Sequence, residues 1–356
     1  MGLHFDFSSE QRLLADSLRG VLAREQQAIG GAADSAIPDL GRRLGEHGVF
    51  GVMTSAKSGG LGLGLTEALV LSIETGRAQT HFPAIETIVA ARLLGLTRPA
   101  AAERILSGEQ IATCASASDA VVMFTGSGSL LRGHATVPFA GHARWLALPV
   151  RKDGNEPGPW AAVVDLASPG ITVSHAPEFD LTYPMFRVML DTPIEPAEVI
   201  AHDLVPILAV LACGELTGAV EHCLELTLRH LKERVQFGKP IGANQSLRHL
   251  AADDWMRVQG MQAASEYAAA SFDAAHDARD GTPFDLLAFE RAAHVAKAYC
   301  SAAARDVAEH AVQMHGGIGF TWDFGLHVPL RRVLRLAISC GGVADHHDAI
   351  ADILLK

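Results

Sequence analysis

The sequence predicts a mainly helical protein with a β domain in its middle third. Apolar residues recur at helical spacing in the first third, and from about residue 112 they give way to short runs rich in β-branched and aromatic residues. Long helical patterns return from about residue 204. We therefore expect an N-terminal helical domain at 1–111, a mostly antiparallel β domain at 112–196 and a C-terminal bundle of four helices at 197–356.

The composition excludes several classes of protein. Hydrophobic residues make up 49% of the 356 residues, but no uninterrupted apolar run reaches the roughly 20 residues of a membrane span. The N-terminal segment lacks the basic and then apolar order of a secretory signal. A formal net charge of −11, without a Lys/Arg block among aromatic residues, argues against a nucleic-acid partner. Five scattered cysteines without CxxC spacing favour reduced thiols in the cytoplasm and imply no metal site.

The first third alternates helical patterns with short loops. Ser8 and Gln11 have the spacing of a capping box, and leucines at helical spacing follow them. A second helix is expected to end near Gly48. After a glycine-rich loop at 58–64, Thr66 is expected to cap the next helix.

The middle third contains four clear strand patterns. Turn residues such as "KDGNEPG" and "ASPG" separate them, which favours a small sheet with short connections. The strands are expected at 143–150, 159–167, 170–176 and 185–191.

The last third predicts four helices. The first is apolar at helical spacing and is expected to stop at Gly238 and Pro240. The third has a clear N-terminal signal, because Pro283 suits the first helical turn and follows Thr282, with Asp285 close behind. The other helices are expected from about Gln245 and at 326–339, and the third runs to Gly316.

Two polar stretches of these helices carry the candidate chemistry, "ERVQFGKPIGANQ" at 233–245 and "QMHGGIGF" at 313–320. In the first, the planar guanidinium group of Arg234 suits a pyrophosphate. Phe237 offers a flat apolar contact, and Gln245 supplies an amide donor and acceptor.

The second stretch ends a helix with a glycine pair. Gly316 and Gly317, which follow Gln313, leave room for close backbone approach and free N–H groups for an anion. A glycine pair after a helix is more often only a helix stop, and an arginine near a helix end is usually solvated. Each feature is therefore weak alone, and the combination on long helices after a β domain is the stronger signal.

This combination resembles the acyl-CoA dehydrogenase family, whose members share the three-part order, an "R-x-x-F-G" stretch followed by Gln, and a "Q-x-x-G-G-x-G" motif. The stretches "FDFSSEQRLLADSLR" and "GLGLTEALVLSIETGRA" are also similar to the family's first domain, so the resemblance covers essentially the whole chain and is poorest in the middle third. It implies a barrel-like middle domain and FAD bound between the subunits of a dimer. The residues that the resemblance assigns to the FAD of a neighbouring subunit are Arg234, Phe237, Gln245, Leu247, Gln313, Gly316 and Gly317.

The catalytic base of that family is missing here. Family members abstract the proton α to the thioester carbonyl with a glutamate, because a desolvated carboxylate has a pKa raised into the range of a useful base. Counted from the glycine motif, the matching position is Cys340 or Gly341, and no acid occurs between Arg335 and Ala344. An apolar site would favour the inert thiol of Cys340, so a small buried residue is the preferred interpretation.

A second family position for the base is also without an acid. Counted back from Arg234 on the first C-terminal helix, it falls on Leu208. Glu215, further along that helix, is a conceivable substitute. In the middle domain, "CASASD" at 114–119 keeps only a trace of the family's "T-E-P-x-A-G-S-D" motif, and nothing matches its "W-I-T-N" strand. Both family motifs contact the flavin ring.

The base and the flavin-ring contacts are thus lost together, whereas the residues that reach a neighbour's FAD are retained. This pattern resembles the non-catalytic subunit of the heteromeric α2β2 acyl-CoA dehydrogenases of bacterial steroid side-chain degradation, as does "GFTWDFGLHVPLRR" at 319–332. The resemblance implies a partner subunit with the catalytic Glu, an acyl-CoA substrate that is desaturated at its α,β-bond, and an electron-transfer flavoprotein as acceptor. Two alternatives remain: a homomeric flavin dehydrogenase with a relocated base such as Glu215, and a dehydrogenase-like scaffold without flavin.

Overall fold

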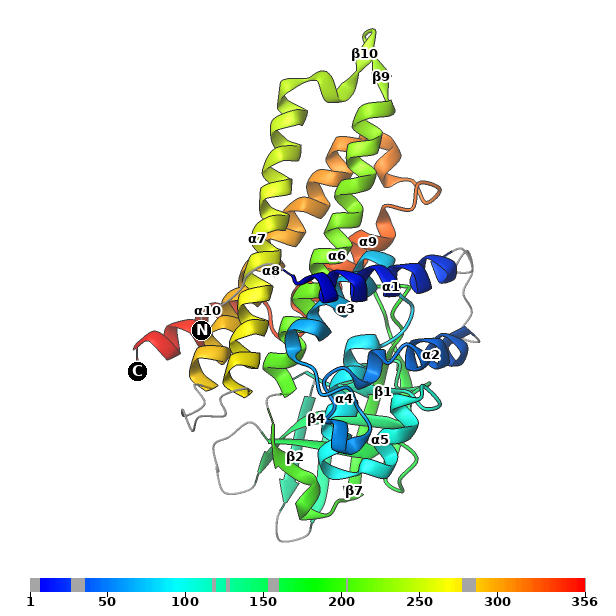
Figure 1. Ribbon diagram of the computed structural model, residues 1–356, viewed down its shortest axis with the longest axis vertical. Helices are drawn as coiled ribbons and strands as arrows, with labels where there is room; N and C mark the ends of the chain where they lie inside the picture. Colours follow the sequence, from blue (N-terminus) through cyan, green and yellow to red (C-terminus); the bar gives the residue numbers. More distant parts are fainter. Residues whose placement is uncertain are drawn as a thin grey trace.

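The fold follows the predicted order of helices, strands and helices (Figure 1). The computed structural model describes residues 7–26, 36–116, 120–125, 129–152, 160–202, 204–276 and 286–355. The expected start of the third C-terminal helix, at Thr282, Pro283 and Asp285, lies outside these residues.

The N-terminal helices begin with the predicted capping box. The Ser8 N–H donates to Gln11 Oε1 (2.8 Å), and the Gln11 N–H donates to Ser8 Oγ (3.2 Å). The second helix ends close to the predicted Gly48, which has a positive φ of 72°. The helices are α1 (Ser9–Gln26), α2 (Ile37–Glu46), α3 (Leu65–Ala78), α4 (Ala84–Thr97) and α5 (Pro99–Leu106), with short 3-10 turns η2 (Val49–Gly51) and η3 (Ala56–Ser58).

The prediction that Thr66 caps a helix was wrong, because the cap of α3 comes from a distant residue. Gly64 is the N-cap, and Thr66 lies inside the first turn. The carboxylate of Asp273, on helix α7 (Gln245–His276), accepts hydrogen bonds from the N–H of Leu65 (2.6 Å), the N–H of Thr66 (2.9 Å) and Thr66 Oγ1 (2.5 Å). A carboxylate at this place satisfies free N–H groups and interacts well with the positive end of the helix. The cap therefore joins the first and last parts of the chain.

The middle strands form one eight-stranded sheet in which most neighbours are antiparallel. The order is β6-β7-β3-β2-β4-β5-β8, and β1 pairs with β4. All four predicted strands are present as β4 to β7, and the structure adds β1, β2, β3 and β8. The strands are β1 (Ala112–Cys114), β2 (Ala120–Thr125), β3 (Leu130–Pro138), β4 (Trp145–Lys152), β5 (Trp160–Asp165), β6 (Ile171–Ala176), β7 (Met185–Pro193) and β8 (Val199–Ala201).

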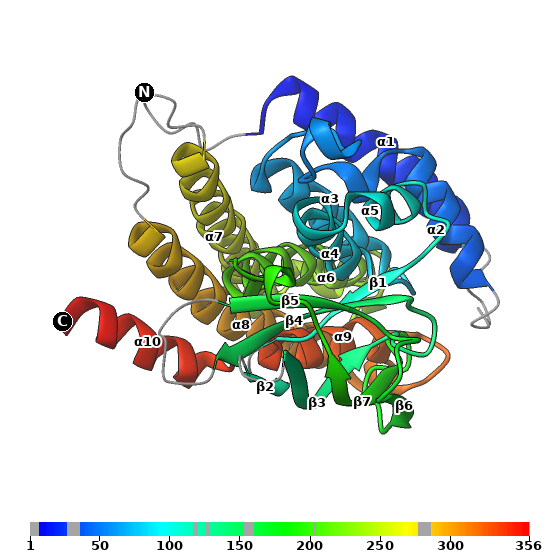
Figure 2. The ribbon, with the colours of Figure 1, turned by 90° about the horizontal axis from the view of Figure 1, so that it is seen from below.

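Strand β4 shows how the sheet joins the helices. Leu146 and Leu148 point into a core that belongs to the sheet itself. Trp145 and Ala147, on the other face, enter the large core shared with the helices. The helices α4 and α6 (Leu204–Glu233) pack against this face, and Figure 2 shows the sheet lying along one side of the helices.

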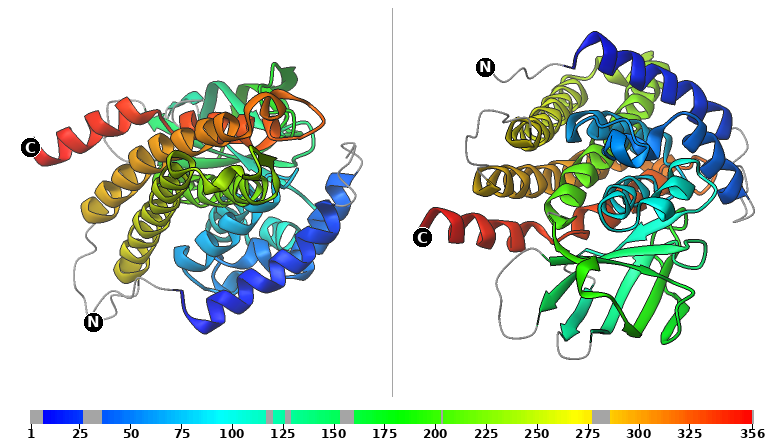
Figure 3. Two further views of the ribbon diagram at one scale, coloured as in Figure 1. Left: turned by 90° about the horizontal axis from the view of Figure 1, so that it is seen from above. Right: turned by 60° about the horizontal axis from the view of Figure 1, so that its bottom comes forward.

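The C-terminal helices differ from the prediction at two places. The first, α6, ends at Glu233 rather than at Gly238, because a two-residue turn with positive φ at Phe237 (51°) and Gly238 (78°) closes a small hairpin. A fifth helix follows the predicted four and projects from the bundle (Figure 3). The elements after α6 are β9 (Val235–Gln236), β10 (Lys239–Pro240), η5 (Ile241–Ala243), α7, α8 (Leu286–His315), η6 (Gly316–Phe320), α9 (His327–Ile338) and α10 (Val343–Leu355).

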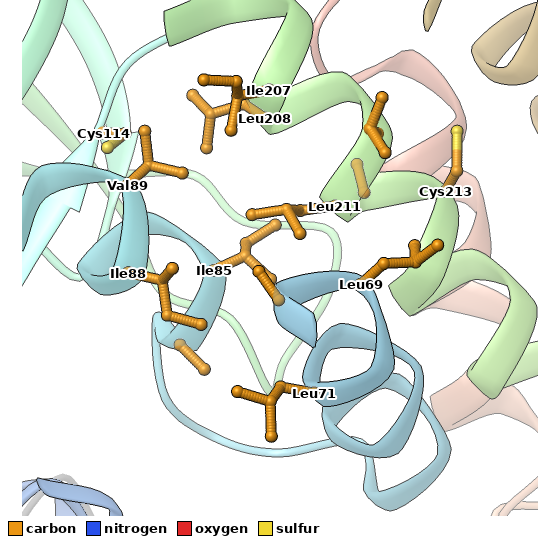
Figure 4. Packing of buried hydrophobic residues seen from close by; sticks show 14 of the residues in the cluster. Leu69, Leu71, Ile85, Ile88, Val89, Cys114, Ile207, Leu208, Leu211 and Cys213 are labelled. Carbon is orange, nitrogen blue, oxygen red and sulfur yellow. The ribbon is translucent and has the colours of Figure 1, made fainter. Parts of the chain in front are cut away.

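Helices α3 and α6 meet almost backbone to backbone. A Cβ built on Gly76 would lie 2.2 Å from the carbonyl oxygen of Glu215, and one built on Gly218 would lie 1.9 Å from that of Ile73. Only glycine permits this approach. Leu208 and Leu211 of α6 pack beside Ile85 of α4 in the same core (Figure 4).

By length and composition alone, α6 is apolar enough to cross a membrane, and it is the one such helix among the described residues. However, 83% of its apolar window is buried inside the fold. It is therefore the central core helix of the bundle.

Candidate functional site

The two polar motifs of the C-terminal helices meet at one end of the bundle, near the β9–β10 hairpin at the top of Figure 1. His230, in the last turn of α6, stacks on His315 at the end of α8, with ring centroids 4.5 Å apart. Met314 packs with Leu231 of α6 and Ala251 of α7. These contacts hold the Arg234 stretch and the Gly316 stretch side by side.

At this end, most of the predicted cofactor residues point outward. Arg234, Gln245 and Gln313 are exposed, and the Phe237 side chain is 99% exposed. Leu247 differs from them, because it is half-buried and packs against the Leu231, Ala251 and Met314 cluster. Leu247 therefore packs inside the bundle, beneath the exposed residues of the motif, in the contacts that the structure describes.

The backbone of Arg234 is fixed, whereas its side chain has no partner within the described parts of the chain. The Arg234 N–H donates to the carbonyl of His230 (2.9 Å), and its own carbonyl accepts from the N–H of Ile241 (2.8 Å). No hydrogen bond or ion pair of the guanidinium group with a described residue is present. The backbone at Arg234 is thus held in place, and the guanidinium group remains available to an external anion.

The two glycines of this stretch differ in whether the structure of the chain itself requires a glycine. Gly316 has a positive φ of 63°, which favours glycine at a helix stop. Gly317 has no positive φ, and a Cβ built there meets nothing within 4 Å. Nothing within the described chain thus requires glycine at 317, whereas close approach of an external group would. This end of the bundle therefore presents an exposed guanidinium group and an open glycine backbone to an external group.

The two family positions for the base converge on a single cavity of about 190 Å³. Leu208, on α6, and Cys340, which lies in the turn between α9 and α10 and has a positive φ of 58°, both line it. Gly341 is buried beside Cys340, and its carbonyl accepts a hydrogen bond from Lys297 Nζ (3.4 Å). The complete lining is Ile85, Glu86, Cys114, Ser116, Pro138, Met185, Leu208, Ala212, Arg335, Leu336, Ile338, Ser339 and Cys340.

Glu215, the substitute base suggested by the sequence, is buried away from this cavity. It is not among the lining residues, and its side chain is 1% exposed. Thr75 Oγ1 donates to Glu215 Oε1 (3.3 Å), and Arg335 Nη2 lies 3.9 Å from Glu215 Oε2. Burial raises the pKa of Glu215. Its surroundings are those of a structural carboxyl group between α3 and α6.

Sequence reasoning missed Glu86, the carboxyl group that does line the cavity. Its side chain is 7% exposed, and the Tyr183 hydroxyl donates to Glu86 Oε2 (2.7 Å). Burial, with a contribution from the charge of Glu215, raises the pKa of Glu86 to about 7. The available signal was an acidic residue inside the largely apolar stretch "AIETIVAA" at 84–91.

A buried ionic network forms one side of this region. Arg332 Nε donates to Asp180 Oδ2 (2.8 Å), and Arg335 Nε lies 3.2 Å from the same oxygen. Although burial alone would raise it, the two guanidinium charges hold the pKa of Asp180 at about 2. Arg335 also lies over the Tyr183 ring, 3.8 Å from its centroid. Within the described chain, no group of three or more His, Cys, Asp or Glu side chains could hold a metal ion.

Comparison with known proteins identifies the family. A model of the acyl-CoA dehydrogenase N-terminal domain matches residues 8–108, and a model of the acyl-CoA dehydrogenase C-terminal domain matches residues 208–355. The chain belongs to the acyl-CoA dehydrogenase family. The predicted fold and family are thereby confirmed, and this is a family of flavoprotein oxidoreductases that act on acyl-CoA.

Two curated relatives come from mycobacteria. Acyl-CoA dehydrogenase FadE34 of Mycobacterium tuberculosis is 30% identical over 83% of this chain, which spans only 39% of the length of FadE34. Acyl-CoA dehydrogenase IpdE2 of Mycolicibacterium smegmatis is 26% identical over 91% of this chain and 92% of its own length.

Two solved structures share the fold along the whole chain. The ChsE4-ChsE5 complex from Mycobacterium tuberculosis has a TM-score of 0.85 at 20% identity, with 99% of each chain covered. The steroid ACAD Tcur3481-Tcur3483, as a G363A variant, has a TM-score of 0.82 at 22% identity, with 97% of this chain and 98% of that chain covered.

Proposed function

We propose that this chain is the base-lacking subunit of a heteromeric acyl-CoA dehydrogenase. It contributes the adenine-diphosphate side of the FAD site to a partner subunit that carries the catalytic Glu. The observation that carries the proposal is the difference between two regions of one molecule. Arg234, Phe237 and Gln313 are exposed together at the end of the bundle, while Leu208 and Cys340 occupy the base positions of the internal cavity.

Each outward residue has a defined task in the assembled enzyme. The guanidinium fork of Arg234 donates to pyrophosphate oxygens, and Phe237 covers an apolar part of the nucleotide. Gln313 donates and accepts hydrogen bonds at the rim, and the backbone at Gly316 and Gly317 approaches the cofactor closely. Bound FAD supplies the hydride acceptor for desaturation of the α,β-bond of a CoA thioester.

Two observations support a heteromer over a homomeric enzyme with a relocated base. Glu215, the substitute base that the sequence suggests, does not line the cavity. The names ChsE4-ChsE5 and Tcur3481-Tcur3483 each join two proteins, and the second is described as a steroid ACAD. On this basis we propose a cytoplasmic α2β2 assembly, a steroid side-chain CoA thioester as substrate and an electron-transfer flavoprotein as acceptor.

Co-expression tests the proposal directly. The chain is produced alone and together with a second dehydrogenase-like protein that retains the Glu, ideally the product of an adjacent gene. We expect the chain alone to be insoluble, misassembled or colourless, and the pair to copurify with FAD at the native mass of an α2β2 tetramer. A well-folded homotetramer of this chain with one FAD per subunit and dehydrogenase activity would refute the proposal. A stable complex without FAD would instead favour the scaffold alternative.

A further inference from the structure

A pair of stacked histidines joins the two stretches that we assign to the shared FAD site. The ring of His230, in the last turn of α6, lies 4.5 Å from the ring of His315, with 25° between the ring planes. The N–H of Arg234 donates to the carbonyl of His230 (2.9 Å), and Gly316 follows His315 directly in the chain. His230 is therefore fixed between the arginine stretch and the glycine pair.

The two histidines differ in whether a positive charge can be accommodated. His315 is 5% exposed, and its Nδ1 lies 2.7 Å from the carbonyl oxygen of Ala311, so Nδ1 carries the proton of the neutral ring. Its Nε2 is buried and has no hydrogen-bond partner among the described residues, so a charge on His315 would be buried without a partner. His230 is only half-buried, and its ring nitrogens make no hydrogen bond with the described part of the chain. His230 is thus the member of the pair that can gain a proton.

Within the chain itself, the surroundings of His230 keep its ring neutral. Burial lowers the pKa of His230 from its ordinary value of 6.5, and His315 and Arg234 lower it further, whereas the charge of Glu233 raises it. These are the titratable and charged groups that act on the ring from α8 and from the end of α6, and its other ring neighbour, Phe324, carries no charge. Most of the rings are therefore uncharged at neutral pH.

A pyrophosphate beside Arg234 would reverse this balance. An opposite charge within about 4–6 Å favours the charged form of a histidine, and the anion would also offset the guanidinium charge that lowers the pKa of His230. The C-terminal end of α6 favours a cation in its last turn as well, because the helix dipole is negative there. By contrast, the residues that the sequence assigns to the cofactor do not titrate near neutral pH.

We propose that binding of FAD by the assembled enzyme takes up a proton at His230, and that the imidazolium group then donates a hydrogen bond to the pyrophosphate beside Arg234. The proton comes from the solvent, and the N–H bond is the one covalent bond that forms. This inference rests on the proposed function and deepens it, because it adds a binding residue and a pH dependence to the shared FAD site.

Proton uptake is measured by isothermal titration calorimetry of FAD into the reconstituted apo complex, near pH 6.5, where an unperturbed histidine titrates. The titration is repeated in PIPES and in bis-tris, which differ in ionisation enthalpy, so the difference in heat reports the protons taken up. We expect uptake of a fraction of one proton. The variant His230→Phe keeps a ring that can stack on His315 and should lose this uptake. His47→Phe, at an exposed histidine at the end of α2, is the matched control and should keep it.

The affinity for FAD should change with pH in the same experiment. Because binding takes up a proton, the Kd rises with pH, and the loss of a charge-assisted hydrogen bond corresponds to a rise of about tenfold from about pH 5.5 to about pH 8. The pyrophosphate of FAD stays fully ionised across this range, so the change reports on groups of the protein. His230→Phe should show a Kd that does not change with pH and is close to that of the parent at high pH.

Two results would overturn the proposal while leaving the FAD site in place. They are equal heats in the two buffers for a parent complex that binds FAD, and proton uptake that persists in His230→Phe, because another group would then take the proton. If the Phe variant does not assemble, His230→Gln keeps hydrogen-bonding groups without titrating, and uptake that survives this change would equally refute the assignment. A parent complex that binds no FAD would show no binding heat in either buffer, and that outcome would refute the proposed function together with this inference.

Discussion

The substitution Arg234→Ala should weaken FAD binding while leaving the stability of the fold almost unchanged. The guanidinium group has no described partner within the chain, and the two backbone hydrogen bonds of residue 234 do not involve the side chain. The free energy of unfolding should therefore change by less than about 0.5 kcal/mol. If the group binds pyrophosphate in the assembled enzyme, the loss of a charge-assisted contact should cost about 1.5–3 kcal/mol of FAD binding. This corresponds to an increase in Kd of about 10-fold to 150-fold.

The assay is an FAD titration of the reconstituted apo complex, with urea unfolding of the same samples as the measure of folding. Arg234→Lys should recover only part of the affinity, because an ammonium group lacks the planar fork. Arg229→Ala is a matched control, since Arg229 is an exposed arginine near the end of α6, five residues before Arg234. An unchanged Kd for Arg234→Ala in a folded complex would remove Arg234 from the site.

Three further predictions concern carboxyl groups. Glu215→Gln in the complex should keep turnover within a few-fold, because Glu215 does not line the cavity; a loss of about 100-fold or more in anaerobic flavin bleaching, with FAD still bound, would assign the base to it. Asp273→Ala should lower the free energy of unfolding by about 2–3 kcal/mol, since the N–H groups of Leu65 and Thr66 lose their acceptor, and Asp273→Asn should lose less. On folding, the pKa of Glu86 rises from 4.5 to about 7, so the folded chain binds more protons than the unfolded chain between these two pH values. The free energy of unfolding should therefore fall as the pH rises through this range, by roughly 3 kcal/mol in total. Urea unfolding at a series of pH values should show this slope in the parent, and its persistence in Glu86→Gln would contradict the assignment.

The fold was predictable where local pattern decides the structure. The capping box at Ser8 and Gln11 and the start of α7 at Gln245 depend on neighbours in sequence, and both are confirmed. The cap of α3 was not predictable, because its acceptor, Asp273, is more than two hundred residues away and is brought there by tertiary packing. The three-residue strands β1 and β8 are too short to show a period of two.

The site was predictable only in part for a related reason. The outward residues carry a spacing that motif comparison detects, and packing of His230 on His315 then brings the two motifs together. Glu86 carries no motif, and counting along the chain from the family positions leads to Leu208 and Cys340 instead. A search for acids inside apolar helical stretches would have found it, because burial of such a residue requires a partner or a raised pKa.

The surroundings of the cavity give no structural reason for the missing base. Arg335, on the helix before Cys340, is anchored by Asp180, so the wall that carries position 340 is held in place. Gly317, in contrast, remains glycine although no described residue lies near its Cβ position. Packing within the chain thus explains neither the absence of a base at position 340 nor the glycine at position 317. Both follow if the outward end of the bundle serves a cofactor held with a partner, while the cavity of this chain takes no part in proton abstraction.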